Sequence, residues 1–123
     1  MKSSDLKRRT FDFGVRCVRL AEALPKSRTA DALGLQLLRC GTSVGANYRA
    51  ACRARTRAEF LAKLGIVEEE CDESVFWMDL ITELDLIQPK LLSSLRQEAD
   101  EILSIIISSI KTARANAKTP KQP

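Results

Sequence analysis

The chain has 123 residues, the size of one domain, and its 45% hydrophobic and 29% charged residues are typical of a soluble globular protein. Its net charge is +4 and it has no histidine, which excludes Ser-His-Asp and Cys-His catalytic centres and the usual zinc and di-iron sites. No apolar run resembles a signal peptide or is long enough to span a membrane, so we expect a cytoplasmic protein without membrane contact.

A first helix is predicted over residues 5–24, and Pro25 ends it. Its apolar residues recur at helical spacing and form two adjacent seams. The first seam consists of Leu6, Phe13, Cys17, Leu20 and Leu24, and the second of Phe11, Val15 and Val18.

A second helix is predicted over residues 29–55, with Asp31 in its first turn and three glycines in its interior, Gly34, Gly41 and Gly45. Each interior glycine costs about 1 kcal/mol relative to alanine. We therefore expect the glycines to allow another helix to approach closely. A kink near residues 40–45 is the alternative.

A third helix is predicted from a capping box formed by Thr56 and Glu59 to about residue 85. Pro89 suits the first turn of a fourth helix that ends near residue 115. Residues 1–115 would then form one antiparallel, up-down four-helix bundle, and residues 116–123 a flexible basic tail. Four cysteines without a CxxC pair lie in or near apolar stripes and are expected to be buried thiols.

The fourth helix carries three consecutive isoleucines, Ile105, Ile106 and Ile107. At 100° per residue they spread over about 200° of the helix surface. A single bundle covers only one stripe of each helix, so we predict that these residues form an interface between copies of the chain.

Charge is divided unevenly along the chain. Residues 1–28 and 29–57 carry net charges of +5 and +4, residues 58–88 carry −8, and residues 89–123 carry +3. The basic side chains of the first two helices could bind nucleic acid, or they could pair with the acidic third helix. The candidate nucleic-acid contacts are Arg8, Arg9, Arg16, Arg19, Arg49 and Arg53.

Two carboxylates of the third helix, Glu70 and Glu73, share a stripe with apolar residues such as Ile66 and Trp77. A carboxylate on such a stripe needs a partner. The second helix offers polar side chains on one face, so we predict a semi-buried structural network of Arg39, Ser43, Asn47, Glu70 and Glu73. A metal or acid–base site made by the same carboxylates is the alternative.

Several segments resemble the bacterial four-helix-bundle family that includes proteins encoded by intervening sequences in large-subunit ribosomal RNA genes. They are Arg39 to Ala51 (RCGTSVGANYRAA), Arg57 to Leu64 (RAEFLAKL), and Glu68 to Glu70, Asp72, Glu73 and Trp77. The chain is also similar to the accessory variability proteins of diversity-generating retroelements. The resemblance implies a ring-like homopentamer, with Ser43, Asn47, Glu70 and Glu73 at the family's polar positions. Many members have glutamate where this chain has Ala50.

Most members of that family have no assigned activity, while the retroelement relatives bind nucleic acid and a reverse transcriptase through a basic surface. We therefore expect a non-enzymatic, homo-oligomeric helical scaffold without a cofactor. Its expected partners are further copies of itself, RNA or single-stranded DNA, and a reverse transcriptase or another protein. A structural or protein-interaction module without a nucleic-acid role is the main alternative, and a carboxylate metalloenzyme is the third.

Overall fold

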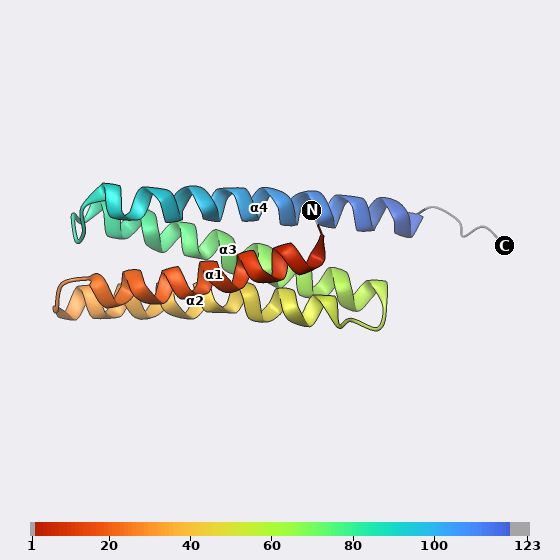
Figure 1. Cartoon of the computed structure of the whole chain (residues 1–123), viewed down its shortest axis with the longest axis horizontal. Coiled ribbons are helices and arrows are strands. Elements are labelled where there is room, and N and C mark those ends of the chain that lie inside the picture. The colour runs from red at the N-terminus through yellow and green to blue at the C-terminus, as the bar shows by residue number, and fades with distance from the viewer. Residues whose placement is uncertain (1, 119–123) are drawn as a thin grey trace.

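The computed structural model describes residues 2–118 and consists of four helices: α1 (Ser3–Ala23), α2 (Arg28–Cys52), α3 (Arg57–Glu83) and α4 (Pro89–Lys118). The long helices lie side by side, and the loops between them fall at alternating ends of the molecule (Figure 1). The predicted all-α class with four helices is confirmed. Within the described residues, no helix has the length and apolar character needed to cross a membrane.

Side-chain caps fix the start of α2 and α3. The Ser27 hydroxyl accepts a hydrogen bond from the Ala30 amide at 3.1 Å, and the Thr56 hydroxyl accepts one from the Glu59 amide at 3.0 Å. The Glu59 carboxylate accepts from the amide of Arg55, one residue before the cap, at 3.2 Å. The Thr56 cap was predicted from the sequence. In a capping box the Glu59 carboxylate would accept from the amide of Thr56, whereas here it accepts from the amide of Arg55.

Two helix ends differ from the sequence prediction. The second helix ends at Cys52 rather than near residue 55, and the fourth continues to Lys118 rather than ending near residue 115. The first three residues of the predicted tail, 116–118, are therefore helical. The rest of that tail, residues 119–123, lies outside the described part of the chain.

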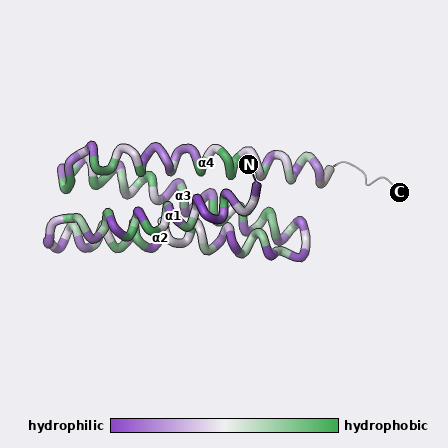
Figure 2. The backbone as a smooth tube through the Cα atoms, in the orientation of Figure 1, coloured by the Kyte–Doolittle hydropathy of each residue, from purple (hydrophilic) through white to green (hydrophobic). Residues whose placement is uncertain are grey.

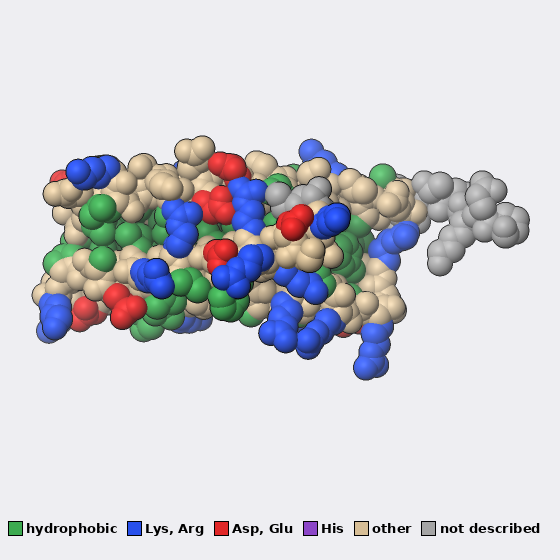
Figure 3. Space-filling model, in the orientation of Figure 1, with side chains coloured by type: hydrophobic (Ala, Val, Ile, Leu, Met, Phe, Trp, Pro, Cys, Tyr) green, Lys and Arg blue, Asp and Glu red, His purple; other side chains and the backbone are tan. Residues whose placement is uncertain are grey.

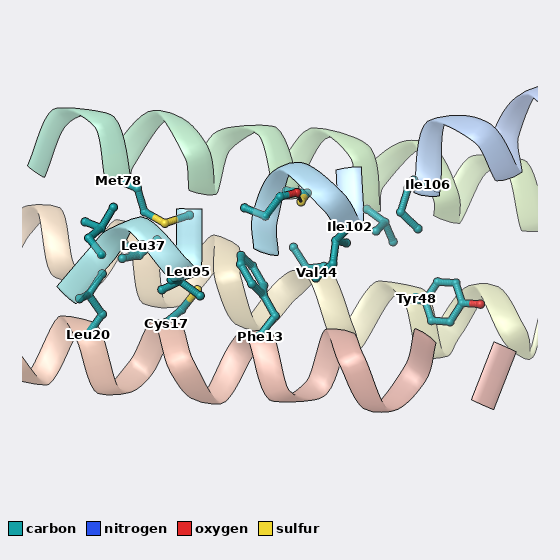
Figure 4. Packing of buried hydrophobic residues seen from close by; sticks show 14 of the residues in the cluster. Phe13, Cys17, Leu20, Leu37, Val44, Tyr48, Met78, Leu95, Ile102 and Ile106 are labelled. Carbon is teal, nitrogen blue, oxygen red and sulfur yellow. Dashed lines mark hydrogen bonds between the residues drawn. The ribbon is translucent and has the colours of Figure 1, made fainter. Parts of the chain in front are cut away.

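The core is an apolar layer to which all four helices contribute. Phe13, Cys17 and Leu20 of α1 point toward Leu37 and Val44 of α2, Met78 of α3, and Leu95, Ile102 and Ile106 of α4 (Figure 4). Apolar and polar residues alternate around the turns of each helix (Figure 2), because only one side of each helix faces this layer.

Helices α1 and α2 approach each other closely at the glycines of α2, through which that helix runs unbroken. A Cβ atom on Gly41 would lie 2.5 Å from Sγ and 2.6 Å from Cβ of Cys17. A Cβ atom on Gly45 would lie 3.1 Å from the carbonyl oxygen of Thr10. The prediction of close approach is confirmed, and α2 is one continuous helix through this region.

The three consecutive isoleucines do not form one outer surface. Ile106 is fully buried in the core, and Ile105 packs against that core. Ile107 is half-buried. The prediction of an interface through Ile106 is wrong, because the 100° step between neighbours turns the middle isoleucine toward the other helices.

Candidate nucleic-acid interface

A groove of about 760 Å³ runs between α1 and α2 on the outside of the bundle. From α1 it is lined by Lys7, Arg8, Phe11, Val15 and Val18, and from α2 by Thr42, Ala46, Arg49 and Arg53, among others. We call it the α1–α2 groove. Its floor is made by apolar side chains and glycines, and its edges by basic side chains.

Helical spacing places these residues along the groove. Lys7, Phe11 and Val15 follow one another at intervals of four, as do Arg49 and Arg53 on the facing helix. The helices can approach because Gly45 has no side chain: a Cβ atom there would lie 3.1 Å from the carbonyl oxygen of Thr10. The floor is therefore formed where the two backbones nearly meet.

The lining of the groove contains four cationic side chains and no acidic one. Within residues 2–118, Lys7, Arg49 and Arg53 have no carboxylate within ion-pair distance. Arg8 pairs with Asp12 at 3.0 Å, but both side chains are at least half exposed. Such surface pairs contribute about 0–1 kcal/mol, so the groove keeps its positive character. Figure 3 shows basic side chains gathered over α1 and α2, with apolar ones between them.

Phe11 is the aromatic residue of this groove. Its side chain is 59% exposed, although exposing a large apolar ring to water is unfavourable. The guanidinium carbon of Arg8 lies 5.3 Å from the ring centroid, a cation–π distance. Neither Phe11 nor Lys7 was predicted from the sequence as a binding residue. The available signal for Phe11 was the second apolar seam of this helix, which lies beside its basic side chains.

The other predicted basic contacts fall into different surroundings. Arg9 is half-buried, and its guanidinium forms ion pairs with Glu98 and Glu101 of α4, each at 2.7 Å. It joins α1 to α4 and is not available to a ligand. Arg16 donates a hydrogen bond to the Ser94 hydroxyl at 3.0 Å, while Arg19 is exposed beside it.

The residues of the predicted polar network come close together without forming one network. The Asn47 side-chain amide donates to the carbonyl and hydroxyl oxygens of Ser43 at 2.9 and 2.8 Å. Arg39 donates to Gln36 at 3.1 Å. Among the described residues, no hydrogen bond or ion pair joins these α2 side chains to Glu70 or Glu73.

Glu70 and Glu73 instead border a smaller groove of about 470 Å³, which Arg39 and Ser43 border from α2. Glu70 is half-buried, whereas Glu73 is exposed because the helix turns it outward. Burial raises the pKa of Glu70 above its ordinary value, the neighbouring Glu73 carboxylate raises it further, and Arg39 opposes the shift. Across residues 2–118, no three His, Cys, Asp or Glu side chains are grouped to hold a metal ion.

A second exposed surface lies on α3 and extends to Leu84, the C-cap residue of that helix. Ile66, Glu69, Glu73, Phe76 and Leu84 are all exposed and fall within about 80° of the helix circumference at 100° per residue. We call this the α3 outer face. Phe76 is 58% exposed and contacts the Trp77 ring edge-on, with the ring centroids 5.0 Å apart. This face is acidic and apolar, whereas the α1–α2 groove is basic and apolar.

Comparisons with known proteins agree on one family. The sequence model of the 23S rRNA-intervening sequence proteins matches residues 2–108. The chain is similar to a crystal structure from Bacteroides thetaiotaomicron VPI-5482, described as a protein of unknown function from the S23 ribosomal protein family. The two are 35% identical with a TM-score of 0.84, and the match covers 90% of this chain and 99% of the other. Comparison with curated proteins gives no match.

Proposed function

This chain belongs to the 23S rRNA-intervening sequence protein family, and from that premise we propose that it is a non-enzymatic, oligomeric helical scaffold that binds RNA or single-stranded DNA. The observation that supports this proposal is the α1–α2 groove. It offers four cations without a lining carboxylate, and a polyanion is the ligand that neutralises all of them.

Phosphate binding would account for the presence of cations on both helices that line the groove. Lys7 and Arg8 line one edge of the groove, and Arg49 and Arg53 line the other. A backbone lying in the groove would release counterions as each cation meets a phosphate, which favours binding at low salt. These contacts carry no sequence information, so we expect sequence-tolerant binding with a dissociation constant on the order of micromolar.

Assembly is the second part of the proposal. The loops at alternating ends support an antiparallel, up-down bundle (Figure 1), and we propose that bundles associate into a ring-like homo-oligomer, the pentamer that the family resemblance implies. The α3 outer face supports self-association, because three large apolar side chains, Ile66, Phe76 and Leu84, are exposed on it. Ring formation would repeat the basic groove, and repeated weak sites on one strand gain avidity.

Light scattering after gel filtration tests the assembly. We expect an oligomer for the wild type, and dissociation without unfolding for Phe76→Asp, because Phe76 is already 58% exposed in the single chain. A monomeric wild type would remove this part of the proposal. If the Phe76→Asp variant forms an oligomer of the wild-type mass, the interface lies on another surface.

Charge reversal tests the nucleic-acid part. In an anisotropy titration with short labelled single-stranded RNA, we expect Arg49→Glu with Arg53→Glu to weaken binding by about tenfold or more, because phosphate contacts are lost. Lys111→Glu with Arg114→Glu is the matched control, since it changes the net charge equally at exposed positions of α4 outside the groove. Equal losses in the two variants would indicate a general charge effect and contradict a site in the groove.

The α3 outer face also supports a protein-interaction module as the second candidate function. Its apolar side chains and carboxylates suit a basic protein partner such as a reverse transcriptase. If the wild type binds no RNA at low salt while Phe76→Asp disrupts its assembly, this second function is favoured.

A further inference from the structure

We infer that the α1–α2 groove binds a single-stranded nucleic acid with one base stacked on Phe11. This inference rests on the proposed function, restricts the RNA or DNA to a single strand and adds a residue that contacts a base. It begins from the combination of an exposed aromatic ring and unpaired cations in one groove.

Phe11 lines the groove together with cations from both helices. Lys7 and Val15 are one turn away from it on α1, and Arg49 and Arg53 line the groove from α2. Single-strand binding proteins use this combination, in which cations follow the backbone and an aromatic side chain stacks on a base. A site for phosphate alone would need the cations but not the ring.

The size and floor of the groove favour a single strand over a duplex. A volume of about 760 Å³ lies within the range of pockets that enclose small organic ligands, so nucleotides can enter it. The bases of a duplex are stacked inside the helix, whereas the bases of a single strand can turn outward onto an aromatic ring. Val15, Val18 and Ala46 provide an apolar floor for the base and sugar.

Arg8 supports the same arrangement. Its guanidinium group lies 5.3 Å from the centroid of the Phe11 ring. A guanidinium group is planar and stacks on aromatic faces, so a base at Phe11 would have both an aromatic and a cationic neighbour. The pair with Asp12 is exposed and weak, which leaves Arg8 able to adjust to a ligand.

A second copy of the chain is the competing occupant. The α3 outer face carries Phe76 next to Glu69 and Glu73, and its charge complements the groove. A base differs from such a partner because it presents a planar ring and comes attached to phosphates. The two possible occupants can be distinguished with an oligonucleotide that lacks bases but keeps its phosphates.

The test compares two labelled oligonucleotides of equal length, one an ordinary single strand and one an abasic strand with the same backbone. Phe11→Ala should weaken binding of the ordinary strand about tenfold, as expected for the loss of one stacked base, and leave binding of the abasic strand unchanged. Phe11→Trp should retain binding, and its added fluorescence should be quenched by the ordinary strand. Phe11→Ala should melt as the wild type does, because Phe11 is 59% exposed.

Three outcomes would overturn the stacking inference, and they differ in what they mean for the proposed function. If Phe11→Ala binds the ordinary strand as the wild type does while Arg49→Glu with Arg53→Glu weakens it, the stacking inference is overturned and the proposed function stands. If the wild type binds neither strand at low salt, both are overturned. If Phe11→Ala changes the mass of the oligomer, a second copy covers the groove and the stacking inference is also overturned.

Discussion

Replacing Gly41 by alanine tests the close contact of α1 and α2 on which the groove depends. The new Cβ atom would lie 2.5 Å from Sγ and 2.6 Å from Cβ of Cys17. A rotation about χ1 can move Sγ but not Cβ, so the two backbones must separate. Alanine gains about 1 kcal/mol over glycine in a helix interior, whereas overpacking costs about 1–3 kcal/mol. Because backbone movement is required, we expect an overpacking cost of about 3 kcal/mol. The net loss in the free energy of unfolding is then about 2 kcal/mol.

Gly65→Ala is the matched control, because no atom beyond the neighbouring backbone of α3 lies within 4 Å of a Cβ built at that position. This substitution should stabilise the protein by about 0.5–1 kcal/mol through helix propensity alone. Denaturant titration at one protein concentration measures both variants, since the stability of an oligomer depends on concentration. If Gly41→Ala were as stable as Gly65→Ala, the close contact of α1 with α2 would be refuted.

Three further predictions concern the core, one carboxyl group and the thiols. Ile106→Ala should cost about 3 kcal/mol of stability in denaturant titration, because the side chain is fully buried, and should not dissociate an oligomer selectively. Since the pKa of Glu70 is raised, its charged form opposes folding above that pKa, and the opposition disappears as the pH falls toward the ordinary value of 4.5. Glu70→Gln should therefore raise the free energy of unfolding near pH 7 and leave it unchanged below about pH 4. Burial raises the pKa of Cys71 to about 12 and also raises the pKa values of Cys17 and Cys40, so a thiol reagent at pH 8 should modify half-buried Cys52 first and the other three only after unfolding.

Local features of the fold were predictable from the sequence because they depend on residues close in the chain. The Thr56 cap needs only Glu59 three positions later, and the four helices follow from apolar spacing. Gly41 could be assigned to a close helix contact because glycine in a helix interior is costly unless space requires it.

Features that depend on distant residues were not predictable. Arg9 belongs to the same basic run as Arg8, but Glu98 and Glu101 occupy its guanidinium, and they lie on the last helix. The interface prediction for Ile106 overlooked a signal that was present, because Ile106 continues the three- and four-residue spacing of Ala99 and Ile102, which marks the side of α4 that faces the core. Glu73 shares a stripe with apolar residues, and yet that stripe is partly solvent-exposed.

The α1–α2 groove could be anticipated only in part. The second apolar seam of α1 and the arginines of α2 were visible in the sequence, but their separation across a groove depends on how closely the two backbones approach. In the structure the exposed ring of Phe11 and the arginines of α2 line the same groove.

The salt dependence of RNA binding by the wild-type protein tests the central claim most directly. We predict measurable binding at low salt, with the logarithm of the association constant falling linearly as the logarithm of the salt concentration rises. The slope should be about −0.7 for each phosphate contact made on a single strand. Four cations in one groove predict a slope of about −3 if each meets a phosphate. Absence of binding at low salt, or binding that does not change with salt, would contradict the account.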